Sequence, residues 1–219
     1  MEREVTGVKR PYDGSLRRAR AEQVRQCLIQ AARTMLLSEG YASTTIPKIA
    51  QACEVSVDSV YKRFPGKPAL VRAVVEQALE GAGPVPAETR SDALAPGDLG
   101  ALLRGWGRLT AEVSPGVAPV LLLVRSAAQQ DPGVAVLAPE LDDNRRNRMR
   151  HNAQRLSDAG HLPPRWSVQQ VADILWSYSS PELYDLMVLR CGWDLPSYGE
   201  FIARGMAAHL DQDSTNAGN

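Results

Sequence analysis

The sequence predicts an all-α protein of about nine to ten helices, with an N-terminal helix-turn-helix head and a larger C-terminal helical body. Apolar residues recur at helical spacing along most of the 219 residues, and no segment alternates like a half-buried strand. Residues 1–80 hold 13 Lys and Arg against 9 Asp and Glu, a balance of +4; residues 81–219 hold the other 12 against 16, a balance of −4. A basic front end on an acidic body favours a polyanion-binding module at the N-terminus.

The composition is that of an ordinary globular protein, with 44% hydrophobic and 23% charged residues. The longest strongly apolar run, residues 120–124, is far shorter than the ~20 residues of a membrane span. Residues 1–14, MEREVTGVKRPYDG, contain no apolar stretch of the kind that secretory signals have. We therefore expect a soluble, cytoplasmic protein with no membrane partner.

The three cysteines, Cys27, Cys53 and Cys191, are odd in number and widely spaced. This pattern is neither a disulfide framework nor a zinc-ligand spacing. Cys27 and Cys53 both fall on apolar helix stripes, so we expect them to be small buried apolar residues in a reducing compartment.

The first helix is predicted from an apolar stripe at i, i+3, i+4 and i+7 that ends at Gly40. Its members are Val24, Cys27, Leu28, Ala31, Ala32, Met35 and Leu36. Thr45 can cap a second helix, in which Pro47 is tolerated because it lies in the first turn. The stripe of the second helix is Ile46, Ile49, Ala50 and Cys53.

A third, short helix over about residues 57–63 follows a break at residues 54–56, and Ser56 can cap it. Its inner face is Val57, Val60 and Phe64, whereas Asp58, Ser59 and Lys62 point outward with Tyr61 at the edge. The pair Pro65-Gly66 ends this helix, and Pro68 opens a fourth. The inward residues of the fourth helix are Leu70, Val71, Val74, Ala78 and Leu79.

Residues 81–98, GAGPVPAETRSDALAPGD, lack periodicity and predict a loop with a domain boundary near residue 81. The body after it is predicted to contain helices at about 98–113, 117–130, 133–159, 167–179, 181–191 and 196–210. The resulting organisation is a basic arm (1–20), a helix-turn-helix domain (21–80), a helical body (81–211) and a disordered polar tail (212–219).

Two short helices joined by a tight turn suit DNA, because the second can enter a major groove while nearby cations hold the backbone. Tyr61, Lys62 and Lys67 are candidates for phosphate contacts. Asp58 would repel phosphates, so it either accepts a hydrogen bond from a cytosine or stabilises the helix start. The alternative is that this polar face is merely solvated.

The stretch TTIPKIAQACEVSVDSVYKRFPGKPAL, residues 44–70, resembles the DNA-binding signature of the TetR family of transcriptional regulators. The matching positions are Thr44 or Thr45, Ile49, Ala50, Cys53, Glu54, Val55, Ser56, Ser59, Tyr61, Phe64, Lys67 and Leu70. Glu54 departs from the family, which usually has glycine there. A left-handed backbone at a non-glycine residue costs about 1 kcal/mol, so Glu54 either bears that cost or shifts the turn.

The resemblance implies DNA contacts in the head and a basic arm that follows the minor groove. The implied DNA-binding residues are Thr44, Thr45, Ser56, Val57, Asp58, Ser59, Tyr61, Lys62, Lys67, Arg17 and Arg18. Lys9, Arg10 and Arg20 also belong to the arm, for which the alternative is a solubilising tail.

Residues 168–210 resemble the closing helices of the family, which implies a homodimer formed through a four-helix bundle. The candidates for that interface, or alternatively for the core of the body, are Leu175, Tyr178, Leu183, Met187, Phe201, Ile202 and Met206. The family also implies a small-molecule effector in an apolar pocket. Trp106, Leu123, Met149, Trp176 and Tyr184 are candidates to line it, or else plain core. Arg145, Arg146, Arg148 and Arg150 follow two aspartates on one predicted helix and favour a salt-bridged, solvated face.

The sequence contains no HExxH, GxSxG, P-loop or GxGxxG motif in a fitting context, so we expect no enzyme, metal or cofactor. The resemblance implies a ligand-responsive regulator, most simply a dimeric repressor that binds a palindromic double-stranded DNA operator and is released by a small molecule. Two alternatives stay open: a helical ligand-binding protein without DNA function, and an architectural DNA binder without an effector.

Overall fold

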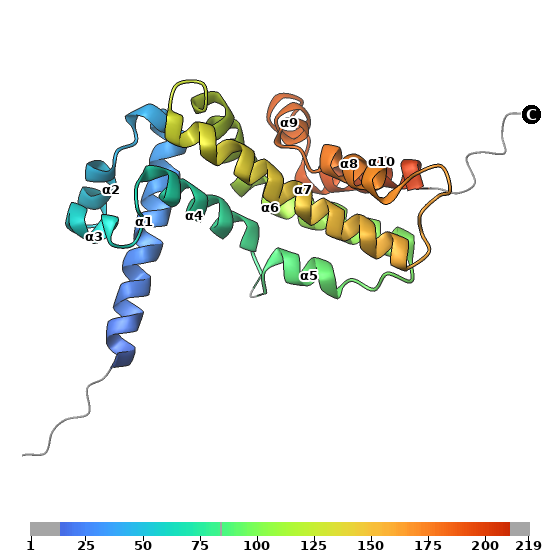
Figure 1. The fold of residues 1–219 in the computed structure, drawn as a ribbon, viewed down its shortest axis with the longest axis horizontal. Coiled ribbons are helices and arrows are strands. Elements are labelled where there is room, and N and C mark those ends of the chain that lie inside the picture. The colour runs from blue at the N-terminus through green and yellow to red at the C-terminus, as the bar shows by residue number, and fades with distance from the viewer. Residues whose placement is uncertain (1–13, 84, 211–219) are drawn as a thin grey trace, which may run out of the picture.

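The computed structural model describes residues 14–83 and 85–210, and across these ranges it contains helices and no strand. The head comprises α1 (Gly14–Ser43), α2 (Ile46–Ala52), α3 (Val57–Tyr61) and α4 (Lys67–Glu80). The body comprises α5 (Ala87–Ala93), α6 (Leu99–Ala127), α7 (Pro132–Asp158), α8 (Val168–Tyr178), α9 (Pro181–Tyr184), the π-helical turn η1 (Asp185–Arg190) and α10 (Leu195–Leu210). The predicted all-α fold is confirmed, with the head at one end of the molecule and the body at the other (Figure 1).

The helices of the head form for the reasons that the sequence suggests. The backbone of Gly40, at φ 82° and ψ 172°, breaks the helical path of α1 at the predicted place. The side chain of Thr45 accepts a hydrogen bond from the N–H of Lys48 and caps α2, and Ser56 caps α3 in the same way. Because α1 begins at Gly14, Arg17, Arg18 and Arg20 are helical, whereas residues 1–13 and 211–219 lie outside the described part of the chain.

Helix α6 is the central element, since it contacts α1, α4, α7, α9 and α10. The expected pair of helices at 98–113 and 117–130 is wrong, because α6 runs without a break through Pro115 and Pro119. A proline inside a helix costs about 3 kcal/mol, so packing on both sides must offset that cost. The buried stripe of Val117, Val120, Leu121 and Val124 supplies this packing.

By length and composition alone, α6 is also apolar enough to cross a membrane. A buried core helix passes the same test, and the apolar side chains of α6 lie against neighbouring helices. The fold therefore gives α6 a core role.

Two apolar cores hold the described chain together. One contains residues of α1 to α4 together with Val117, Val120 and Val124 of α6 and Val134 and Leu137 of α7. The other lies within the body, between α6, α7, α8 and α10. Helix α4 ends at Glu80 with Gly81 as its C-cap, and the core of the head continues beyond it into α6 and α7.

The expected loop at 81–98 contains the short helix α5, which the lack of periodicity hid. Ala87 and Ser91 are buried, and Arg90 donates two hydrogen bonds to the carboxylate of Glu112 on α6, at 2.6 and 2.8 Å. The same carboxylate accepts from the N–H of Ala82 at 2.7 Å. Tertiary contacts to α6 thus stabilise a helix of seven residues that would not persist alone.

The expectation that Cys27 and Cys53 are small buried apolar residues, without a disulfide, is wrong. Cys27 on α1 and Cys53 at the end of α2 form a disulfide, with Cα atoms 5.9 Å apart, and Cys27 is exposed. Both positions lie at the edges of their apolar stripes, where the two helices approach each other. Cys191 is free and exposed.

A candidate nucleic-acid interface and a cavity in the body

The turn between α2 and α3 is built around Glu54. Its φ is 53°, which makes it the one non-glycine residue with positive φ in the described chain. The N–H of Glu54 donates to the carbonyl of Gln51 at 3.1 Å, and that of Val55 to Ala50 at 3.0 Å. Glu54 therefore adopts the left-handed conformation and leaves the turn in place, with its side chain exposed.

Helix α3 presents a polar surface because its apolar side chains point inward. Val60 is fully buried and Phe64 is nearly so. The hydroxyl of Ser56 accepts from the N–H of Ser59 at 3.2 Å and lies 2.9 Å from its hydroxyl. Asp58 and Lys62 are exposed, Tyr61 is 51% exposed, and Thr45 is exposed at the start of α2. Asp58, Tyr61 and Lys62 thus lie outward as the helix pattern predicts, whereas Ser59, predicted outward, and Val57, predicted inward, are both half-buried.

Two of the predicted DNA-binding residues have structural roles. Thr44 is fully buried, and its hydroxyl donates to the carbonyl of Gly40 at 2.8 Å. The ammonium of Lys67 donates to the carbonyls of Tyr41 and Thr44, at 2.8 and 3.1 Å, and lies 3.7 Å from the centre of the Tyr41 ring. Burial lowers the pKa of Lys67. The structure thus turns this cation onto the end of α1 rather than outward.

The predicted DNA-binding set omitted two further cations of the head, Arg63 and Lys48. Arg63 is exposed just after α3, where its guanidinium donates to the carbonyl of Ser59 at 3.0 Å. Lys48 on α2 is exposed and bonds to Glu39 at 2.7 Å. Arg63 follows Lys62 directly in the sequence, so its charge alone could have identified it as a candidate for a DNA contact. Arg17, Arg18 and Arg20 are exposed on the first turns of α1, whereas Lys9 and Arg10 lie outside the described residues.

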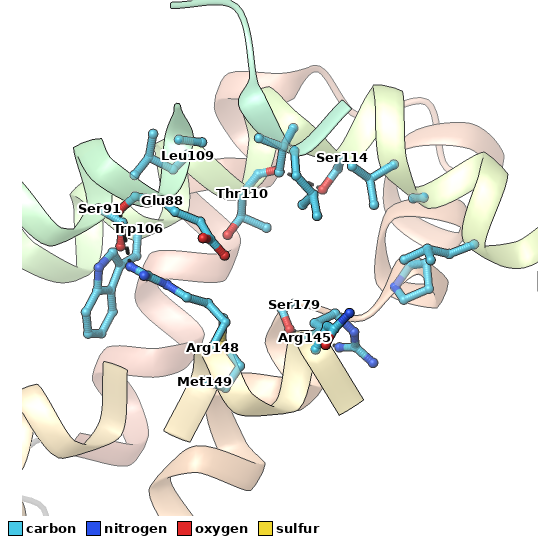
Figure 2. Close-up of a pocket in the computed structure, with 18 of the residues that line it drawn as sticks. Glu88, Ser91, Trp106, Leu109, Thr110, Ser114, Arg145, Arg148, Met149 and Ser179 are labelled. Carbon is cyan, nitrogen blue, oxygen red and sulfur yellow. Dashed lines mark hydrogen bonds between the residues drawn. The ribbon is translucent and has the colours of Figure 1, made fainter. Parts of the chain in front are cut away.

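A cavity of about 220 Å³, partly open to solvent, lies between α4, α5, α6, α7, α8, α9 and α10. Figure 2 shows Trp106, Ser91 and Arg148 toward one end of it and Arg145 and Ser179 toward the other. Most of the lining is apolar, as small-molecule sites usually are. Of the residues predicted to line a pocket, Trp106 and Met149 do so. Leu123, Trp176 and Tyr184 are absent from the lining.

The cavity has a few polar groups among its apolar side chains. Asn152 is 95% buried, and its amide oxygen has no hydrogen-bond partner in the described chain. The indole N–H of Trp106 is buried without a partner there too. Buried polar groups normally find partners, so a bound molecule with a donor and an acceptor would satisfy this pair.

One wall of the cavity belongs to the head. Arg72, Val75, Glu76 and Leu79 of α4 line it. Arg72 also makes a two-point hydrogen-bonded ion pair with Glu140 of α7, at 2.8 and 2.5 Å. Helix α4 therefore contacts both the cavity and the core of the head.

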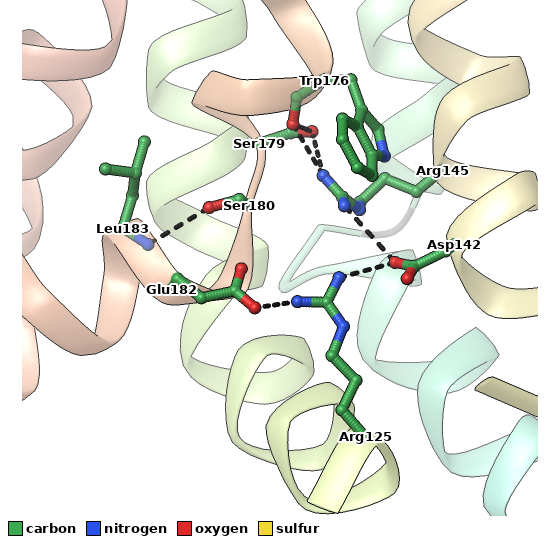
Figure 3. Close-up of polar contacts among 8 residues, drawn as sticks. All are labelled: Arg125, Asp142, Arg145, Trp176, Ser179, Ser180, Glu182 and Leu183. Atoms are coloured by element: carbon green, nitrogen blue, oxygen red, sulfur yellow. Dashed lines mark hydrogen bonds and ion pairs between the residues drawn. The ribbon is translucent and has the colours of Figure 1, made fainter. Parts of the chain in front are cut away.

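A polar network lies at the junction of α6, α7, α8 and α9 (Figure 3), and two of its members, Arg145 and Ser179, also line the cavity. Arg145 donates to the carbonyl of Trp176 at 2.7 Å and to the hydroxyl of Ser179 at 2.9 Å. Arg125 donates to Asp142 at 2.7 Å and to Glu182. Burial lowers the pKa of Arg145 to about 10.

The expected solvated arginine face is therefore wrong for two of its members. The side chains of Arg145 and Arg148 are only 13% and 16% exposed, because α7 turns them toward α8 and α5. Arg145 and Arg146 also stack on Trp176, each 4.5 Å from the ring centre. Arg150 is exposed, as expected.

The candidate interface residues divide between core and surface. Leu175, Ile202 and Met206 are buried inside the body and line the cavity, so the core alternative holds for them. Tyr178, Leu183, Met187 and Phe201 are half-buried. The exposed apolar side chains nearby are ones that the prediction missed: Leu186, Leu189, Trp193 and Leu195.

In the described ranges, no three His, Cys, Asp or Glu side chains gather in a way that could hold a metal ion.

Comparisons of the sequence and the fold with known proteins found one family model and several solved structures that are similar to this chain. The family model described as "Bacterial regulatory proteins, tetR family" matches residues 28–74. No curated protein matches the sequence. Among solved structures, the fatty acid degradation regulator FadR from Bacillus halodurans has a TM-score of 0.67 at 16% identity, over 85% of this chain and 96% of that one.

Two further structures are similar over most of their lengths. The SmeT–triclosan complex has a TM-score of 0.67 at 18% identity, over 90% of this chain and 96% of that one. NalD, the secondary repressor of the MexAB-OprM multidrug efflux pump in Pseudomonas aeruginosa, has a TM-score of 0.61 at 19% identity, over 89% and 98%. At such identities the likeness establishes the fold.

Proposed function

We propose that this protein is a ligand-responsive transcriptional repressor, because residues 28–74 match the model of the tetR family of bacterial regulatory proteins. As a homodimer it binds a palindromic operator, and a small molecule in the cavity releases it. The observation that carries the proposal is that α4 forms a wall of the cavity and part of the core of the head. Its operator would be genomic DNA, which places the protein in the cytoplasm.

In this proposal α3 enters the major groove with Val57, Asp58 and Ser59 nearest the base edges. Tyr61, Lys62 and Arg63, exposed at the end of α3, contact phosphates on its flank. Arg17, Arg18 and Arg20 lie along the start of α1 and add backbone or minor-groove contacts. These three arginines offset the repulsion that Asp58 brings to the interface.

The cavity sets the chemistry of the effector. Its mostly apolar lining favours a small molecule with an apolar body. The unpartnered oxygen of Asn152 and the indole N–H of Trp106 favour one hydrogen-bond donor and one acceptor on that molecule. The similarity to the SmeT–triclosan complex supports a small-molecule site in this fold.

The release of the operator follows from the distance between the two heads of the dimer. Two heads on one duplex must lie about 34–36 Å apart to meet successive major grooves. A ligand that contacts Val75 and Leu79 would displace α4, and α4 shares its core with α1, α2 and α3. A small rotation of each head then breaks the match, so the ligand and the operator bind different arrangements of the dimer.

Selection from a random DNA pool tests the DNA function. We expect an inverted repeat with half-site centres about 10 base pairs, or a multiple of this, apart. Failure to enrich any duplex would instead favour a helical ligand-binding protein without DNA function.

Ligand response is tested with Leu109→Trp, which fills the cavity, and the matched control Val136→Trp on the exposed surface of α7. Small molecules are screened by thermal shift, and each hit is assayed for release of the selected duplex. The Leu109→Trp protein should bind DNA but ignore the hits, whereas Val136→Trp should respond like the parent. A protein whose DNA binding no cavity ligand alters would be an architectural binder.

A further inference from the structure

The head contains a covalent link that the proposed function does not use. Cys27 of α1 and Cys53, the residue that ends α2, form a disulfide. Their Cα atoms are 5.9 Å apart, within the range of about 4.4–6.8 Å that disulfides require, so the backbone positions of both helices suit the bond. Cys27 is exposed and Cys53 is half-buried, so Cys27 is the more accessible of the two to small reactants.

At one end the disulfide ties down α1 close to where its packing begins. Residues 15–23 are all exposed, whereas Val24 and Leu28 pack into the core of the head. Figure 1 shows the first turns of α1 continuing beyond the rest of the head. The bond at Cys27 therefore fixes the direction of the segment that carries Arg17, Arg18 and Arg20.

At its other end the disulfide meets the turn that places α3. Cys53 directly precedes Glu54, whose φ of 53° is unfavourable for a residue with a side chain. Backbone hydrogen bonds from Glu54 and Val55 to the last turn of α2 also hold this turn, at 3.1 and 3.0 Å. One bond thus constrains both the arginine-bearing end of α1 and the entry to α3.

We propose that Cys27 and Cys53 form a reversible thiol–disulfide modification site whose oxidised state has the higher affinity for DNA. The reactant class is a low-molecular-weight disulfide in one direction and the corresponding thiol in the other. The effect on DNA rests on the proposed function. In the cytoplasm, where thiols are mostly kept reduced, disulfides are typically transient or redox-sensing, which fits a reversible site.

The exchange proceeds in two balanced steps. The thiolate of Cys27 attacks one sulfur of the small disulfide RSSR, forms a mixed disulfide and expels RS⁻. The thiolate of Cys53 then attacks the sulfur of Cys27, forms the protein disulfide and expels the second RS⁻. The two protons lost by the protein thiols convert both RS⁻ to RSH. Two thiols are oxidised and one RSSR is reduced to two RSH, and excess RSH reverses both steps.

Reduction should weaken DNA binding by lowering the population of heads in the binding arrangement. Without the disulfide, the turn at Glu54 and the arginine-bearing first turns of α1 can move independently of each other. If both heads keep the arrangement seen here in about a fifth of the reduced dimers, the apparent dissociation constant rises about fivefold.

The test uses the full-length Cys191→Ser protein, so that the exposed third cysteine forms no link between chains. The protein is equilibrated in buffers of oxidised and reduced glutathione, and its free thiols are counted by mass after alkylation. The affinity for the selected duplex is measured in each buffer by fluorescence anisotropy. Cys27→Ser and Cys53→Ser, each combined with Cys191→Ser, are the matched controls.

As the proportion of oxidised glutathione increases, we expect the thiol count to fall from two to zero. The affinity for DNA should rise about fivefold over the same range of glutathione ratios, and the affinity of neither control should change. Oxidation that leaves the affinity unchanged, or the same redox response in the controls, would overturn the proposal while leaving the repressor function intact. If no duplex is bound in any redox state, the proposed function fails and the DNA effect with it. The thiol count then still reports whether the exchange occurs.

Discussion

Glu54 shows how one residue can conflict with the conformation that the fold requires of it. Its left-handed backbone is stabilised by the hydrogen bonds of the turn, not by its own side chain, which is exposed. Glycine adopts the same φ without the clash at Cβ. The turn therefore keeps its form at a local energetic cost.

Glu54→Gly should raise the free energy of unfolding by up to about 1 kcal/mol, because the left-handed strain disappears. Urea denaturation measures it, with Glu54→Ala as the matched control, which removes the charge but keeps the strain. A gain in Glu54→Ala equal to that in Glu54→Gly would assign the effect to charge.

Lys67 illustrates a cation whose partner is the protein itself. Lys67→Met keeps the apolar stem but leaves the carbonyls of Tyr41 and Thr44 without their donor. We expect a loss of about 1–3 kcal/mol in the free energy of unfolding, measured by urea denaturation.

The control for Lys67 is Lys62→Met, an exposed cation of the same type that should lower DNA affinity and leave the urea midpoint unchanged. If Lys67→Met behaved like this control, Lys67 would be a phosphate contact after all.

At the scale of helices, α4 is the element that joins the two proposed activities. It lines the cavity, packs against α1 and α6, and is held to α7 by Arg72 and Glu140. The hydrogen bonds from Arg72 lower the pKa of Glu140. Both side chains are more than a third exposed, so solvent screens much of their attraction.

A double-mutant cycle with Arg72→Gln and Glu140→Gln should give a coupling of about 0.5 kcal/mol at pH 7. Because the folded-state pKa of Glu140 is depressed, this stabilisation is present above the pKa of the unfolded chain and is lost as the pH falls through the folded value. Urea denaturation at pH 7 and at about pH 3 measures the coupling at each. A coupling that persists unchanged in acid would show that packing rather than charge links α4 to α7.

At the scale of the molecule, the surface around η1 and the start of α10 exposes several large apolar side chains. Leu186, Leu189, Trp193 and Leu195 are between 37% and 55% exposed there. Exposed apolar groups that lie together usually mark an interface. We propose that the dimer contact lies at this surface, together with Leu183 of α9 and Met187 of η1, which are half-buried.

Leu189→Asp should give a folded monomer with much weaker operator binding, since the second half-site contact is no longer intramolecular. Leu175→Asp is the matched control: Leu175 is 1% exposed, so a carboxylate there should unfold the body. Sedimentation and circular dichroism separate the two results. A helical dimer of Leu189→Asp would place the subunit contact elsewhere.

The sequence by itself determined the helices of the head, since caps, prolines and apolar spacing act within a few residues. Thr45, Ser56 and Gly40 mark helix ends for local reasons, and the outward set on α3 follows from the same periodicity. The family resemblance had the same source, because the matched positions lie within one continuous stretch.

Tertiary structure alone decided the features that depend on residues far apart in the chain. It kept α6 continuous through two prolines, turned Lys67 onto the end of α1, paired Cys27 with Cys53 and buried Arg145 against α8. It also merged the core of the head with α6 and α7 across the boundary at Gly81. Periodicity reports which face of a helix is apolar, whereas the partner of that face is set by packing between distant segments. The cavity, whose lining residues come from seven helices, depends on the packing of those helices.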